Sequence, residues 1–111
     1  MSIVKLEKTA WHAFFDAASK ALIGKRAEVE VDALSFGSQI EAEWLPLLGI
    51  TYDAKDELIE IVIDGLDHLA YKAREIHIDQ TAVGLSSLEI VDADDVKIII
   101  KLRDPLMLRA P

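Results

Sequence analysis

The chain contains no cysteine, and this absence excludes several classes of protein at once. Disulfide scaffolds, cysteine-ligated zinc sites, iron–sulfur clusters and thiol nucleophiles all require the missing side chain. No apolar run approaches the roughly 20 residues that a membrane-spanning helix needs. The first eight residues lack a basic segment followed by an apolar one, so no signal peptide is expected. These absences predict a cytoplasmic protein that makes no use of a membrane.

Motifs of nucleophilic and nucleotide chemistry are also missing. The chain has no Gly-x-Ser-x-Gly, no phosphate loop ending in Gly-Lys-Ser or Gly-Lys-Thr, and no Gly-x-Gly-x-x-Gly. We therefore assign no catalytic residue and no cofactor, and a non-enzymatic role is favoured. At 111 residues the chain is long enough for one core and too short for two, so a single domain over residues 1–111 is expected.

Charge is distributed unevenly along the chain. Residues 27–96 hold 17 acidic and 3 basic side chains, whereas residues 1–26 and 97–111 together hold 9 basic and 3 acidic ones. The net charge of −8 repels phosphate backbones at long range, so nucleic-acid binding is disfavoured. The basic residues near the end of the chain are expected to pair with acidic neighbours inside one sheet.

Residues 9–23 have the apolar spacing of a helix. Thr9 is a candidate N-cap, and Gly24 suits the left-handed position just past the helix end. The apolar stripe, spaced at the helical period, consists of Trp11, Phe14, Phe15, Ala18 and Leu22. Such a stripe predicts a helix docked on a sheet or over an open barrel end.

After Gly24 the apolar residues alternate with polar ones, as they do in half-buried strands. We expect Pro46 to end or bend one strand and Asp64-Gly65 to form a tight hairpin. Another strand places Ile40, Ala42 and Trp44 on one face. The expected strands, followed by a short tail over 104–111, are 27–33, 39–45, 48–52, 57–63, 68–72, 75–79, 87–91 and 96–103.

These elements predict an α+β fold that is mostly β. The N-terminal helix precedes a β body over about 27–103, packed as a strongly bent antiparallel sheet or a small, partly open barrel that hides its edges. Sm-like and SH3-like domains share that architecture. The analogy concerns the fold and carries no function.

Histidines and acidic turns are the candidate sites for chemistry. His68 follows Asp67, but adjacent strand residues point to opposite faces, so the carboxylate is poorly placed to orient the imidazole. His77 is expected to face outward between two carboxylates, at a spacing that is not diagnostic of metal binding. Residues 92–95 fail the calcium-loop pattern, because a glycine is missing at its sixth position and a glutamate at its twelfth, so they are interpreted as a polar turn. No metal site is predicted.

Residues 44–50 are almost all apolar, beginning with Trp44. Either both faces of this strand are covered, or one face is a contact surface. The leading hypothesis is a non-enzymatic interaction module that contacts another protein or itself through the acidic β face or the patch near Trp44. The alternative is a small-molecule site near His68 and Tyr71.

Several stretches are familiar when taken together. They are the helix segment 11–15 (WHAFF), the segment 37–42 (GSQIEA) running to 45–53 (LPLLGITYD), the pair 67–69 (DHL) and the segment 88–90 (LEI). With these motifs the chain resembles a family of short bacterial proteins known only as a domain of unknown function. The resemblance spans nearly the whole chain and implies a bacterial protein, with no assigned activity or site residues to carry over.

Overall fold

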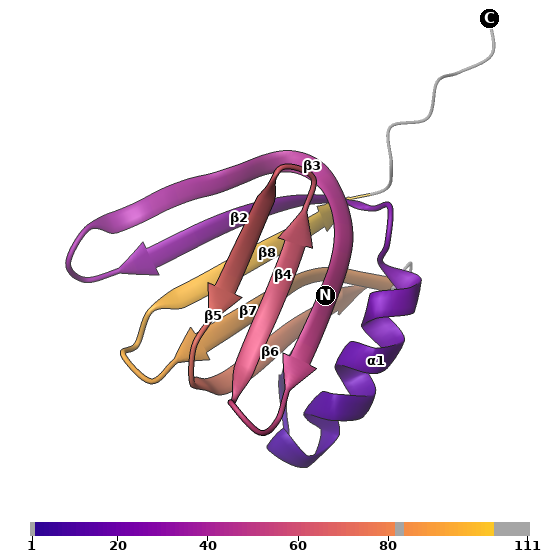
Figure 1. Ribbon diagram of the computed structural model, residues 1–111, viewed down its shortest axis with the longest axis horizontal. Coiled ribbons are helices and arrows are strands. Elements are labelled where there is room, and N and C mark those ends of the chain that lie inside the picture. Colours follow the sequence, from indigo (N-terminus) through magenta and orange to yellow (C-terminus); the bar gives the residue numbers. More distant parts are fainter. Residues whose placement is uncertain (1, 82–83, 104–111) are drawn as a thin grey trace, which may run out of the picture.

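The part of the chain described by the computed structural model, residues 2–81 and 84–103, begins with a strand and a short helix and continues with seven strands (Figure 1). The expected tail over 104–111 lies outside the described residues. The elements are β1 (Ser2–Leu6), a 3-10 turn (Lys8–Ala10), α1 (Trp11–Ala21), β2 (Arg26–Ala33), β3 (Gly37–Asp53), β4 (Leu58–Ile63), β5 (Leu66–Ala70), β6 (Ala73–Thr81), β7 (Gly84–Asp92) and β8 (Lys97–Arg103).

The eight strands of the described residues form one antiparallel sheet in the order β1-β6-β7-β8-β2-β3-β4-β5. The long strand β3 belongs to both halves: its first part pairs with β2 and its second part with β4. The sheet therefore folds over on itself along β3, as Figure 1 shows, and β1 and β5 remain as separate edges. This arrangement confirms the predicted mostly β fold with a bent sheet that is not closed.

The prediction of two separate strands, 39–45 and 48–52, is wrong, because β3 is a single bent strand over this region. Pro46 bends the strand and does not end it. The register of β3 against β2 shifts twice, and Trp44 adopts a positive φ of 56° inside the irregular stretch. Such bulges add residues on one strand and bend it sharply. They also separate Ile40 from Ala42, which the sequence placed on one face: Ala42 lies opposite the buried Val29 and is itself buried, whereas Ile40 is exposed.

The core lies between the two halves of the folded sheet, and α1 closes one side of it. Trp11 and Phe15 are almost completely buried, and the Trp11 ring meets Tyr52 of β3 edge to face at 5.4 Å between centroids. The strands contribute an isoleucine-rich interior, as their alternation predicts. Its fully buried strand residues include Ile50, Ile59, Ile61, Ile63, Ile76, Leu88, Ile90, Ile98 and Ile100.

The helix is shorter than the sequence predicted. It begins at Trp11, after the 3-10 turn, and Ala10 occupies the N-cap without a side-chain hydrogen bond, so the prediction of Thr9 as N-cap is wrong. Gly24 does adopt the left-handed conformation, with φ of 90°. Its amide donates to the carbonyl of Leu47 at 2.9 Å, which ties the end of the helical segment to β3. No helix in the described part of the chain is long and apolar enough to span a membrane.

The basic last strand pairs with acidic neighbours inside the sheet, as its charge predicted. Strand β8 pairs with β7 on one side and β2 on the other, and Lys101 Nζ lies 3.8 Å from Glu28 Oε1 of β2. The basic end of the chain thus meets the acidic strand inside one sheet. Strand β1, which pairs with β6, was not predicted, because five residues at the start of the chain give too little alternation.

Candidate functional site

Trp44 lies in the β3 bulge and is half-buried by a basic neighbour. The Arg103 guanidinium at the end of β8 lies 3.4 Å from the centroid of the indole ring. This is a close cation–π contact, in which the positive group covers the negative face of the ring. Within the apolar stretch that begins at Trp44, Leu47 and Ile50 are buried while Leu45 and Leu48 are exposed. The core therefore covers part of this stretch and leaves another part exposed.

His68 and Tyr71 occupy different environments. His68 lies opposite the buried Ile61 on the core side of the edge strand β5 and is half-buried, whereas Tyr71 follows the end of that strand and is exposed. Among the described residues, no hydrogen bond, ion pair or ring contact joins the two side chains. Asp67 lies opposite Val62 and points to the other face, as the alternation predicted.

Asp67 instead makes a contact with a second carboxyl group. Its hydrogen bond to Glu60 on the neighbouring strand β4 raises the pKa of Glu60, because one of two adjacent carboxyls retains a proton more readily. Asp67 is exposed and Glu60 is half-buried at the outer face of this sheet edge. Paired carboxylates of this kind respond to acid, but a pair alone does not define a substrate.

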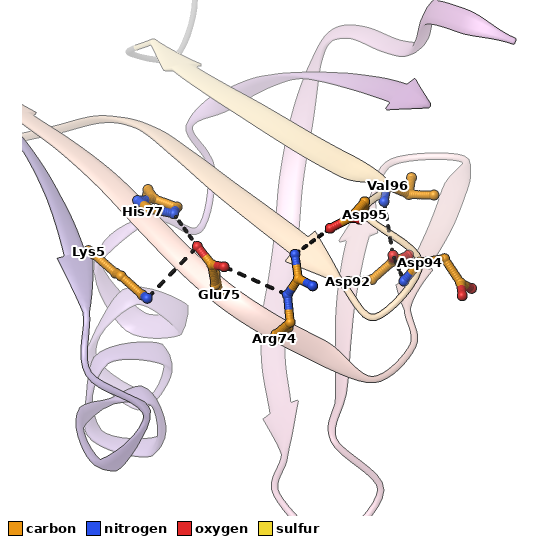
Figure 2. Close-up of polar contacts among 8 residues, drawn as sticks. All are labelled: Lys5, Arg74, Glu75, His77, Asp92, Asp94, Asp95 and Val96. Carbon is orange, nitrogen blue, oxygen red and sulfur yellow. Dashed lines mark hydrogen bonds and ion pairs between the residues drawn. The ribbon is translucent and has the colours of Figure 1, made fainter. Parts of the chain in front are cut away.

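A polar network on the outer face of β1 and β6 centres on Glu75 (Figure 2). His77 Nε2 lies 3.1 Å from Glu75 Oε1, Lys5 Nζ lies 3.9 Å from the same oxygen, and Arg74 Nε lies 3.7 Å from Glu75 Oε2. Arg74 also pairs with Asp95 in the turn before β8. His77 therefore faces outward, as predicted, and the network joins β1, β6 and the β7–β8 turn.

The acidic turn over residues 92–95 is held by its own carboxylate. Asp92 Oδ1 accepts hydrogen bonds from the amides of Asp94 at 2.8 Å and Val96 at 3.0 Å, as Figure 2 shows. This is the side-chain turn that aspartate favours. It supports the interpretation of these acids as a polar turn, and the described residues contain no group of three histidine or acidic side chains that could hold a metal ion.

The network borders a shallow depression of about 390 Å³. Basic and acidic side chains both line it, namely Arg74, His77 and Lys97 together with Glu75, Glu89 and Asp95. The charges face one another at short range, so the arrangement stabilises the packing of β1 against β6 more directly than it selects a ligand of one charge.

The network predicts a dependence of stability on acid pH. The hydrogen bond with His77, with Lys5 and Arg74 nearby, holds the pKa of Glu75 below its ordinary value of 4.5. A carboxyl with a lowered folded pKa stabilises the fold above its unfolded pKa, and this contribution is lost as pH falls through the folded value. We expect Glu75→Gln to be less stable than the wild type at neutral pH, and the difference to shrink below pH 4.5.

Thermal unfolding followed by circular dichroism across this pH range tests the prediction. Glu43→Gln is the matched control, since Glu43 is an exposed glutamate of β3 whose side chain makes no hydrogen bond or ion pair with the described residues. A Glu75→Gln melting temperature that stays equally far below the wild-type value at every pH would contradict the assignment.

A feature that sequence reasoning missed is an exposed apolar arm. We define the arm as residues 32–41, comprising the end of β2, the turn and the start of β3, which extend beyond the rest of the sheet in Figure 1. Leu34 is fully exposed, and Phe36 and Ile40 expose 47% and 49% of their surface. The available signal was two large apolar residues, Leu34 and Phe36, between the expected strands 27–33 and 39–45, where polar residues are usual.

Comparison with known proteins agrees with the resemblance noted in the sequence. Residues 2–111 match a family described as a family of unknown function, DUF5335. An uncharacterised protein of the bacterium Aquifex aeolicus (strain VF5) is 32% identical over 109 residues, which cover 97% of this chain and 98% of the relative. No solved structure matches. The chain therefore belongs to the DUF5335 family of unknown function.

Proposed function

We propose that the protein is a non-enzymatic self-association module whose arm contacts a second copy of the chain. The observation that carries this proposal is the set of three large apolar side chains on the arm, Leu34, Phe36 and Ile40, in a region where every residue from 34 to 41 is exposed. Apolar groups gathered on a projecting element are typical of protein contact surfaces. Burial of such groups is the main favourable term in association.

The charge of the chain supports a second copy as the partner. The arm and the strands that carry it, residues 27–43, contain five acidic side chains and no lysine or arginine. The opposite sign gathers where α1 meets β2, at Lys20, Lys25 and Arg26. One molecule thus offers both halves of a complementary pair, which favours correct encounter and suppresses contacts between two acidic surfaces.

Native mass spectrometry of tag-free protein, purified without chelators, tests the proposal. We expect a defined multiple of the chain mass with no added mass, decreasing on dilution. The chain mass alone at every concentration would overturn the proposal. A monomer that carries a reproducible small-molecule mass would also overturn it, and would favour the site near His68 and Tyr71.

A further inference from the structure

An apolar groove lies along one side of α1, at the end of the sheet where β6 and β7 meet. Its volume is about 410 Å³, and its walls come from three elements: the helix, Gln80 at the end of β6 and Leu85 near the start of β7. The helix contributes Phe14, Ala17, Ala18, Ala21 and Leu22. The small alanine side chains leave the groove open, and the larger side chains of Phe14, Leu22 and Leu85 make its walls apolar.

The walls of the groove are fixed by the core. Phe14 is half-buried and meets Phe15 edge to face at 5.2 Å between centroids, and Phe15 is almost completely buried. Leu22 and Ala18 are buried on the same side of the helix. The groove is therefore a preformed surface, which reduces the entropy lost when a partner binds.

The charged residue in the lining of the groove is basic: Lys25. Lys20 in the last turn of α1 and Arg26 at the start of β2 are its basic neighbours in sequence. The arm has the opposite sign, because Asp32 and Glu41 bound the apolar tip and further acids follow on both strands. An apolar tip with acidic flanks is complementary to an apolar groove lined by a lysine.

We propose that the groove receives the arm of a second copy of this chain, with Leu34 and Phe36 against the alanine face of α1. This inference rests on the proposed self-association and names the surface that receives the arm. The arm and α1 lie at opposite ends of the view in Figure 1. Each molecule therefore inserts its arm into one neighbour and receives an arm in its own groove. This holds whether the assembly is a two-fold pair or a ring.

Ala17→Glu tests the groove. The added carboxylate lies on an exposed helix position, so the fold is retained, but it blocks the groove and repels the acidic arm. We expect the dissociation constant of self-association, measured by sedimentation velocity, to rise by about thirtyfold or more, the size of a hot-spot substitution. Ala13→Glu is the matched control, with the same charge on the same helix outside the groove, and is expected to associate as the wild type does.

Mixing two defective chains identifies the pairing. Leu34→Ser/Phe36→Ser retains the groove, and Ala17→Glu retains the arm, so an equimolar mixture is expected to form heterodimers although each variant alone is monomeric. A mixture that stays monomeric would overturn the arm-in-groove contact. Persistent association of Ala17→Glu would overturn it as well, and would leave the groove to another occupant such as residues 104–111. A monomeric wild type would instead overturn the proposed function itself.

Discussion

Replacing Trp11 with alanine is expected to lower the free energy of unfolding by about 3–5 kcal/mol. Trp11 is 1% exposed and joins three parts of the fold. Its ring packs against Tyr52 of β3, and its indole Nε1 donates to the carbonyl of Leu6, the last residue of β1, at 3.2 Å. Truncation leaves a cavity, removes the edge-to-face contact and frees an acceptor, and these losses act together.

Urea unfolding followed by far-ultraviolet circular dichroism measures this effect. His12→Ala is the control, since His12 is the exposed neighbour on the same helix and is expected to change stability by no more than about 0.5 kcal/mol. A domain of this size has a total stability of about 5–15 kcal/mol, so Trp11→Ala removes a large fraction of it. A loss of less than about 1 kcal/mol would mean that α1 does not hold the two halves of the sheet together.

The double substitution Leu34→Ser/Phe36→Ser is expected to abolish self-association. Both side chains lie at the tip of the arm, outside the core, so their replacement leaves the fold intact while removing the apolar surface that a second copy would bury. Loss of two central apolar contacts raises a dissociation constant by about a hundredfold or more. Sedimentation velocity over a wide concentration range is the measurement.

Tyr71→Ser is the matched control for the arm variant. Tyr71 is also a large exposed side chain that follows a strand, at 63% exposure, but it lies next to β5 and away from the arm in sequence. It is expected to associate as the wild type does. If Tyr71→Ser dissociates the oligomer while the arm variant does not, the contact surface lies at the β5 edge and the arm assignment is wrong.

Most of the sheet could be predicted because its alternation is strict. Ile59, Ile61 and Ile63 are buried as expected, since a period of two in a half-buried strand leaves one register that hides them all. The turn at Asp64-Gly65 followed from residue chemistry, and Gly65 has the positive φ of 85° that such turns require. Apolar alternation and turn residues were sufficient to predict a strand or a turn wherever the tertiary packing favours the same local structure.

The bend of β3 could not be predicted in the same way. Its bulges place Ala42 in the core and Ile40 at the surface, against the simple alternation, because the strand must cross from one half of the sheet to the other. Pairing partners on β2 and β4 decide where such irregularities fall, and these partners are not visible in the strand's own sequence. The arm was missed for the same reason: its exposure follows from where β2 and β3 leave the core.

The predicted site residues are separated by the same bend. Trp44 lies against Arg103 near the end of β8, whereas His68 lies on the edge strand β5. Sequence spacing gave no means of placing them relative to each other. The contact between Trp44 and Arg103 was also outside sequence reasoning, because it joins residues from the middle and the end of the sheet.

Backbone hydrogen–deuterium exchange measured at increasing protein concentration tests the central claim most directly. Amides in residues 34–41 are expected to exchange more slowly as the protein concentration rises, while exchange in the β4–β5 hairpin stays unchanged. The exchange measurement uses the wild-type chain, so no substitution can confound the result. Exchange in the arm that is independent of concentration, in a sample shown by mass to associate, would contradict the claim that the arm is the contact surface.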